Sequence, residues 1–194
     1  MNRKEPVFLK FRFPVICGIK HSGKSTCGKL AAEMTGLPFR DLDTEIERLY
    51  RERYGTAASC REIYRNNGAD AFRALETEAA VRIAAQEPSV TAAGGGLCDN
   101  PQAWNILKEA GAFFVYLDEP EERLFTRITA GGLPPFLAGG DPKALFHKLY
   151  GERDTFYRSR CDAVLPHACP EPAPRERAEK LVAILTAAGK GEKQ

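Results

Sequence analysis

The sequence contains no long apolar run, and this absence limits where the protein can work. None of its apolar stretches approaches the roughly 18 residues that a membrane-spanning helix needs. Residues 1–6 are charged, and they are followed by neither the long apolar stretch nor the cleavage site of a secretory signal. We therefore expect a cytoplasmic protein that does not use a membrane as a partner.

A strong charge of one sign is also missing. The chain has 28 Lys and Arg residues against 26 Asp and Glu residues, which gives a formal net charge of +2. This balance offers no argument for nucleic acid or an anionic membrane surface as a partner. We expect a small-molecule substrate and a monomeric protein.

Closely spaced cysteines are absent as well. The six cysteines are scattered along the chain, and no two of them form a C-x-x-C pair. In a chain of this size the pattern indicates reduced, mostly buried thiols and argues against a disulfide framework or a zinc site.

Nothing in the sequence suggests a repeat or a second domain. The apolar fraction of 43% supports a full core, and 194 residues suit one α/β unit. We expect a single domain over residues 1–194, with a disordered tail over about 189–194.

The strongest motif lies between Gly18 and Thr26, which fits the phosphate-binding pattern G-x-x-x-x-G-K-[ST]. It follows an apolar run that ends at Cys17 and precedes a helical pattern. Glycines let successive N–H groups turn inward, and the helix N-terminus favours an anion. The alternative is a glycine turn before an ordinary helix. The predicted nucleotide-binding residues here are Gly18, Lys20, His21, Ser22, Gly23, Lys24, Ser25 and Thr26, with Lys24 on the β/γ-phosphates and Ser25 on Mg²⁺.

Strand and helix patterns alternate along the chain, which predicts a parallel sheet covered by helices on both faces. The expected strands are 13–17, 38–41, 89–93, 112–117 and 162–165. The expected helices are 24–34, 44–54, one that resumes after Ser59 and breaks at Asn67–Gly68, 70–86, 102–109, 120–129, 142–160 and 175–188. Residues 131–140 have no regular period and predict a loop.

Carboxylates follow the second predicted strand. Asp41 and Asp43 stand at its carboxyl end, where open α/β sheets bind ligands. One could face a metal and the other a second substrate. The alternative is that Asp43 only caps the next helix.

Three further features could carry chemistry. Arg73 and Glu76 share a helix face, which could also be a plain surface ion pair. The triple glycine Gly94–Gly96 directly follows a strand, so it indicates close approach of backbone to a ligand or another segment, unless it is only a loop. Arg153 and Tyr157 lie one helical turn apart, where a solvated Arg is the default interpretation.

Taken in this order and spacing, these pieces resemble the shikimate kinase family. The resemblance runs from about Phe11 to about Leu165 and includes the phosphate loop, Asp41-x-Asp43, Phe72-Arg73-x-x-Glu76 and Gly94–Gly96. It implies a three-layer α/β/α P-loop kinase with a five-stranded parallel sheet in the order 2-3-1-4-5 and a flexible lid over about 131–140. It also implies ATP-dependent phosphorylation of the shikimate 3-hydroxyl, on the route to aromatic amino acids.

The resemblance also implies roles for individual residues. Asp43 would bind the shikimate hydroxyls and act with Lys24 in catalysis, and Arg73 and Arg153 would grip the carboxylate. Gly94, Gly95 and Gly96 would line the same pocket. Asp41 would help Ser25 hold Mg²⁺, and Arg127 would stack on adenine. These assignments are chemically reasonable, because a planar guanidinium fits a carboxylate and a carboxylate can accept the proton of an attacking hydroxyl.

The lid departs from the family pattern. Family members usually carry Arg-Pro-Leu-Leu where this chain has Pro134-Pro135-Phe136-Leu137, and no residue from Ile128 to Gly140 is positively charged. A cation there can be worth orders of magnitude in rate. Lys20 or His21 could replace the missing charge, or both could be ordinary solvated loop residues. Three interpretations stay open: a working shikimate kinase, a kinase for another polyol acid such as gluconate, and a non-catalytic nucleotide- or shikimate-binding protein.

Overall fold

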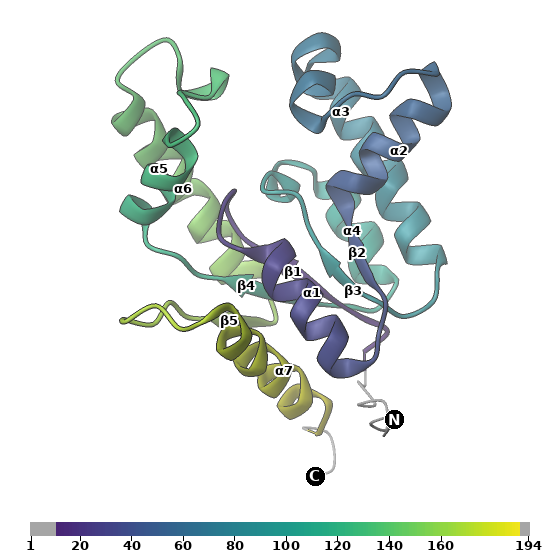
Figure 1. Ribbon diagram of the computed structural model, residues 1–194. Coiled ribbons are helices and arrows are strands. Elements are labelled where there is room, and N and C mark those ends of the chain that lie inside the picture. The colour runs from purple at the N-terminus through teal and green to yellow at the C-terminus, as the bar shows by residue number, and fades with distance from the viewer. Residues whose placement is uncertain (1–10, 191–194) are drawn as a thin grey trace.

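The computed structural model describes residues 11–190, in which strands and helices alternate and pack in three layers (Figure 1). The strands are β1 (Phe13–Cys17), β2 (Phe39–Asp41), β3 (Val90–Ala92), β4 (Ala112–Leu117) and β5 (Ala163–Leu165). The α-helices are α1 (Lys24–Thr35), α2 (Leu42–Tyr54), α3 (Cys60–Ala85), α4 (Pro101–Glu109), α5 (Glu121–Thr129), α6 (Pro142–Arg160) and α7 (Pro174–Lys190). Two short 3₁₀ turns, η1 (Leu97–Asp99) and η2 (Pro135–Leu137), complete the set.

All five strands belong to one parallel sheet in the order β2-β3-β1-β4-β5, as predicted. The central strand β1 pairs with β3 on one side, where Val15 is opposite Thr91, and with β4 on the other, where Val15 is opposite Phe114. Because the strands are parallel, their carboxyl ends share one edge of the sheet. That edge is where a ligand is expected.

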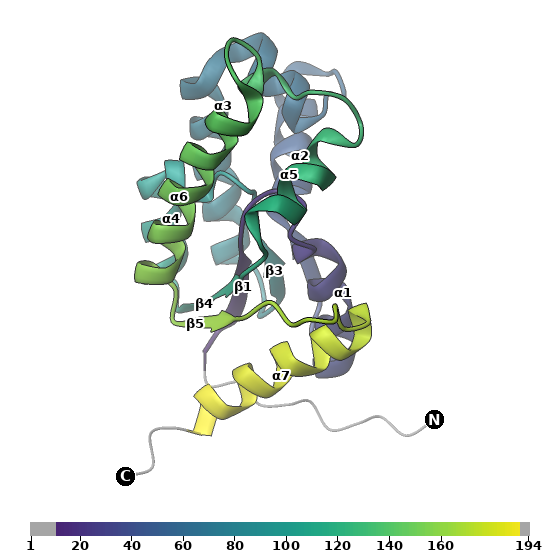
Figure 2. The same ribbon diagram turned by 90° about the vertical axis from the view of Figure 1, so that its left-hand side faces the viewer.

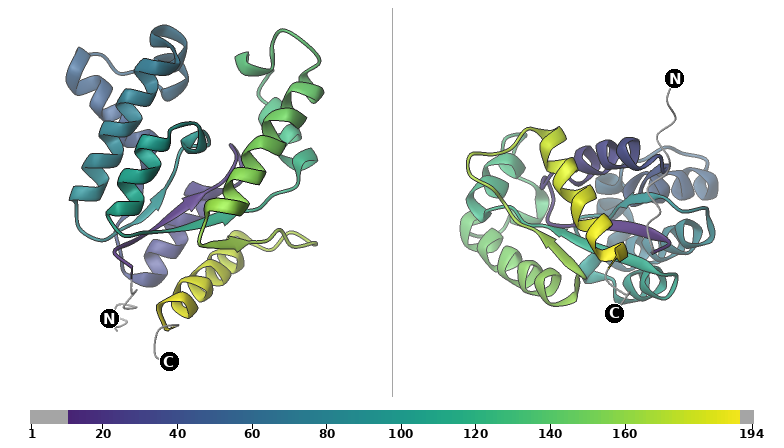
Figure 3. Two further views of the ribbon diagram at one scale, coloured as in Figure 1. Left: turned by 180° about the vertical axis from the view of Figure 1, so that it is seen from behind. Right: turned by 90° about the horizontal axis from the view of Figure 1, so that it is seen from below.

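Helices cover both faces of the sheet, and the side chains of the central strands β1 and β4 alternate between two apolar layers. Ile16 of β1 packs in the layer that also holds buried residues of α1 and α7. Val15 and Cys17 pack in the opposite layer, with residues of α2, α3, α4 and α6. In the view from below, α1 and α7 cross the same face of the sheet (Figure 3). Burial on both faces explains why β1 and β4 are continuous apolar runs.

Two helices differ from the predicted boundaries. Helix α2 begins at Leu42, two residues before the predicted start, and its N-cap is Asp41, whose side chain accepts from the Asp43 N–H. The alternative in which Asp43 caps this helix is therefore wrong. Helix α3 runs through the predicted break, but Gly68 leaves helical geometry with φ 80 and ψ 175, so the break appears as a kink.

The segment between α5 and α6, residues 131–140, is more structured than the predicted loop. It contains η2, and its Leu137 is fully buried against Ile128, Phe146 and neighbouring apolar side chains. Leu133 and Phe136 stay exposed. Figure 2 shows this segment arching over the same end of the molecule as the first part of α3.

Two further predictions concern the thiols and the tail. All six cysteines are free, but only Cys17 and Cys27 are buried and Cys169 is exposed, so burial was predicted too broadly. Helix α7 includes Gly189 and Lys190, where the disordered tail was expected to begin, and the rest of that prediction lies outside the described residues. Within residues 11–190, no helix combines the length and apolar character needed to cross a bilayer.

Candidate active site

The loop after β1 adopts the conformation that its glycines permit. Gly18 and Gly23 have positive φ angles of 148 and 88, and Gly23 caps the N-terminus of α1. His21 also has a positive φ, 66, which is uncommon for a residue with a side chain. Backbone strain of this kind is typical of loops that the surrounding structure holds for a ligand.

Lys24, the first residue of α1, is buried beneath this loop. Its Nζ donates to the carbonyl oxygens of Gly18 and Ile19, at 2.9 and 3.1 Å. Burial lowers the pKa of Lys24 to about 8, and nearby Asp43 opposes this shift. A cation held under a curled backbone is arranged to meet an anion that enters the loop.

Ser25 and Asp41 meet at the start of α1 and the end of β2. The Ser25 hydroxyl donates to Asp41 Oδ2 at 2.7 Å, and the other carboxylate oxygen accepts from the Asp43 N–H at 3.0 Å. A hydroxyl and a carboxylate are oxygen donors of the type that Mg²⁺ prefers beside phosphates. No cluster of three or more His, Cys, Asp or Glu side chains suited to a metal occurs in residues 11–190.

Asp43 lies beside the first glycine of the triplet. A Cβ on Gly94 would come within 2.7 Å of Asp43 Oδ1 and 3.3 Å of Glu76 Oε1, so these two oxygens are at most 6.0 Å apart. Burial and the neighbouring Asp41 raise the pKa of Asp43, while Lys24 opposes the shift. The glycine is thus required by two carboxyl groups that approach its Cα closely.

Glu76 is a further functional candidate. From the sequence alone, its spacing from Arg73 indicated only a possible surface ion pair between the two residues. It is 2% exposed, and its Oε2 accepts from Asn100 Nδ2 at 2.9 Å. Burial raises the pKa of Glu76 to about 7, against the effect of that hydrogen bond. Its spacing from Arg73 placed it on the same helix, but only the fold shows that it faces Asp43.

The second glycine, Gly95, connects the phosphate loop to α6. A Cβ on Gly95 would meet the backbone N of Lys20 at 3.0 Å, and the Gly95 carbonyl accepts from Arg153 Nη1 at 2.9 Å. Arg153 also pairs with Asp99 at 2.6 Å. The default interpretation of Arg153 as a solvated helical residue is therefore wrong, and the close approach expected of the glycines is present at Gly94 and Gly95.

Arg73 has a different partner from the one its spacing suggested. Its guanidinium pairs with Asp70 and is 43% exposed, so it does not contact Glu76, Arg153 or the glycines in this structure. Its backbone is close to them, because the Arg73 carbonyl accepts from Asn100 Nδ2 at 2.9 Å. The side chain would have to leave Asp70 to reach a ligand beside Gly94.

Arg127 lies on the opposite side of the phosphate loop from the glycines. Its Nη1 donates to the His21 carbonyl at 3.2 Å and its Nη2 to Glu171 at 2.7 Å. The predicted nucleotide-binding residues therefore gather around one loop. Lys20 and His21 are exposed at its tip.

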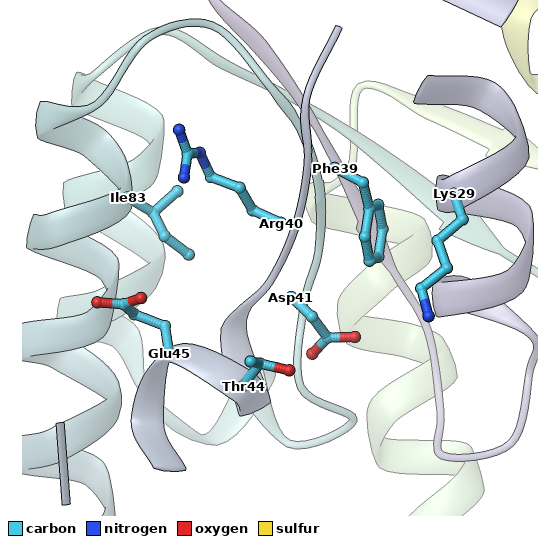
Figure 4. A pocket seen from close by; sticks show the side chains of 7 residues that line it. All are labelled: Lys29, Phe39, Arg40, Asp41, Thr44, Glu45 and Ile83. Carbon is cyan, nitrogen blue, oxygen red and sulfur yellow. The ribbon is translucent and has the colours of Figure 1, made fainter. Parts of the chain in front are cut away.

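A pocket of about 300 Å³ opens at the outer side of β2, next to Asp41 (Figure 4). In Figure 4 the strand passes between Lys29 of α1 and Ile83 of α3. The pocket is lined by Lys29, Phe39, Arg40, Asp41, Thr44, Glu45 and Ile83. It contains neither Asp43 nor the glycine triplet, so it is not the predicted acceptor site.

These features together define a nucleotide-dependent kinase of the P-loop class. They are the order and direction of the strands, a phosphate-type loop after β1, and carboxylates at the end of β2. The family profile described as "Shikimate kinase" matches residues 20–186. Shikimate kinase of Thermobifida fusca is 37% identical over 175 residues, covering 90% of this chain and 95% of that one. Shikimate kinase of Gloeobacter violaceus is 34% identical and covers 89% and 93%. The chain belongs to the shikimate kinase family.

Solved structures agree with this assignment. A shikimate kinase from Acinetobacter baumannii in complex with shikimate aligns with a TM-score of 0.79 and 28% identity, covering 93% of this chain and 96% of that one. A gluconokinase from Sinorhizobium meliloti aligns with a TM-score of 0.57 and 21% identity, which is a likeness of fold alone.

Proposed function

We propose that this protein transfers the terminal phosphoryl group of ATP to the 3-hydroxyl of shikimate, giving shikimate 3-phosphate. The observation that carries the proposal is the position of Asp43 beside Gly94 and close enough to Lys24 for their charges to interact, in a chain of the shikimate kinase family. Phosphoryl transfer needs in-line placement of the acceptor and positive charge around the transferring group more than it needs covalent help. The cytoplasmic location and the monomeric state stay predictions from the sequence.

The nucleotide side of the reaction would use the loop after β1. The β- and γ-phosphates would draw Lys24 Nζ from the carbonyls of Gly18 and Ile19, and the N–H groups at the start of α1 would face the same oxygens. Ser25 and Asp41 have the oxygen donors to hold Mg²⁺. A magnesium ion held there would neutralise charge on the phosphates. Arg127 would lie against the base.

The acceptor side would use Asp43 to orient the hydroxyl and take its proton. Burial raises the pKa of Asp43, which makes it a better proton acceptor than an exposed aspartate. Arg153 is positioned to grip a carboxylate, since its partner Asp99 is itself a carboxylate that a ligand could replace. Arg73 would join it after leaving Asp70.

A coupled assay of ADP release tests the proposal, with shikimate, gluconate and no acceptor in parallel. We expect release that depends on shikimate and is weak with gluconate. Release with gluconate alone would favour a kinase for another polyol acid. Binding of both ATP and shikimate without any ADP release would favour a non-catalytic protein.

A further inference from the structure

Glu119 is a buried carboxylate that the proposed reaction does not use. It follows β4 by two residues and is 1% exposed. A buried charge is costly unless partners satisfy it. The partners of Glu119 therefore indicate what this residue is for.

Four cationic or titratable side chains from three segments of the chain converge on Glu119. Arg177 of α7 donates to its Oε1. Its Oε2 has no hydrogen-bond partner among the described residues, yet His167 Nδ1 lies at 3.6 Å, Arg127 Nη1 at 3.7 Å and Arg123 Nη1 at 3.9 Å. The carboxylate thus joins α5, α7 and the segment between β5 and α7.

Two of these arginines also hold the phosphate loop from outside. Arg177 Nη1 donates to the Ser22 carbonyl at 3.0 Å, and Arg127 Nη1 donates to the His21 carbonyl at 3.2 Å. The C=O and the following N–H of a trans peptide point in opposite directions. Holding the Ser22 carbonyl outward therefore aims the Gly23 N–H into the loop.

We propose that Glu119 is a positioning residue of the nucleotide site. It fixes Arg177 and faces Arg127, and these two arginines fix the carbonyls of Ser22 and His21, so that the loop is shaped for phosphate before a nucleotide arrives. Preorganised N–H groups bind an anion more tightly, because no binding free energy is lost in ordering the loop. The inference rests on the proposed function, because it assumes that the loop binds a nucleotide.

The test compares Glu119→Gln with Glu179→Gln, a control on α7 whose carboxylate is 59% exposed and pairs only with Arg175 among the described residues. Calorimetric titration measures ADP affinity and shikimate affinity separately. We expect Glu119→Gln to weaken ADP binding about tenfold or more, because ADP would then have to order the loop as it binds. Shikimate affinity should stay within twofold of wild type, and the control should bind both like wild type.

Unchanged ADP affinity in a folded Glu119→Gln protein would overturn the inference, and so would an equal loss of ADP and shikimate affinity, which indicates general damage. If that variant does not fold, Arg177→Met replaces it with the same expectations. Hydrogen exchange of the Gly23 amide without any ligand gives a second readout, and faster exchange in the variant is expected. ADP release by the wild-type protein with shikimate tests the proposed function separately, because it does not depend on the affinities of the variants.

Discussion

At the scale of single residues, the absence of a side chain at Gly94 shapes the proposed acceptor site. A Cβ there would lie 2.7 Å from Asp43 Oδ1, closer than real Cβ contacts allow. Gly94→Ala should displace Asp43 and lower kcat by about a hundredfold, as misplacement of a reacting group does. Steady-state kinetics with circular dichroism would check this. Gly151→Ala, where nothing lies within 4 Å, is the control, and wild-type kcat in Gly94→Ala would contradict the placement.

Glu76 makes the stability of the protein depend on pH. Burial raises its pKa from 4.5 to about 7, so between these values the folded protein keeps a proton that the unfolded chain has released. The stabilisation is complete below pH 4.5 and is lost as the pH rises through about 7. In urea unfolding, the free energy of unfolding should decline by roughly 3 kcal/mol over this window. Glu76→Gln should flatten the decline, and the exposed Glu33→Gln should not.

Arg73 is the predicted acceptor residue whose side chain the structure leaves outside the site. If it leaves Asp70 to grip the carboxylate of shikimate, Arg73→Ala should weaken shikimate binding by roughly 2–4 kcal/mol, as expected for a lost charged partner. Asp70→Asn provides the matched control, because it removes the present partner and should leave shikimate affinity unchanged or higher. An Arg73→Ala affinity within twofold of wild type would remove Arg73 from the site.

At the scale of elements, the kink at Gly68 divides α3 into two parts. Before Gly68 the helix carries the Ser59–Glu62 capping box and Cys60, whose thiol contacts the Asp43 carbonyl at 3.4 Å. After Gly68 it carries Arg73 and Glu76. The kink thus divides the helix into a capped first part that contacts the Asp43 backbone and a second part that carries Arg73 and Glu76.

Gly68 is suited to the kink because of its backbone alone. Its φ of 80 and ψ of 175 belong to a region that residues with a side chain rarely adopt, and a Cβ there would meet nothing within 4 Å. Gly68→Ala should therefore cost about 1–3 kcal/mol of stability through strain, without any clash. Denaturant unfolding beside Asn67→Ala, the preceding residue, would measure it. Equal stability of the two variants would mean that the helix straightens without cost.

At the scale of the whole molecule, the sheet could be predicted from the sequence, whereas many of the side-chain contacts could not. Alternating apolar runs and helical patterns were enough to place five parallel strands, since the central strands β1 and β4 are apolar on both faces of the sheet. The pairing of Arg73 with Asp70 and of Glu76 with Asn100 could not be read from spacing, because an i, i+3 relation does not say which way a side chain turns. Glu119 was missed because its partners come from α5, α7 and the β5–α7 segment, far apart in sequence.

The segment over residues 131–140 remains the least conventional part of this kinase, since no residue from Ile128 to Gly140 is positively charged. Transition-state charge in phosphoryl transfer is normally met by cations, so we expect wild-type turnover below the typical enzyme value of about 10 s⁻¹. Pro134→Arg should raise kcat more than it changes substrate affinity. Because Pro134 is buried, Leu133→Arg at a 51% exposed position is the safer companion, and Leu133→Gln is its uncharged control.

Single-turnover and steady-state kinetics would separate the outcomes of the lid experiment. A rise in kcat with either arginine and none with Leu133→Gln would show that charge over the site limits the wild-type reaction. Wild-type turnover at or above about 10 s⁻¹ would contradict the prediction. Another cation would then already serve the transferring group, and Lys20, exposed on the phosphate loop with its backbone against Gly95, is the first to examine by Lys20→Ala. If Lys20→Ala lowers kcat and Leu133→Arg leaves it unchanged, the cation that stabilises the transition state belongs to the phosphate loop and not to residues 131–140.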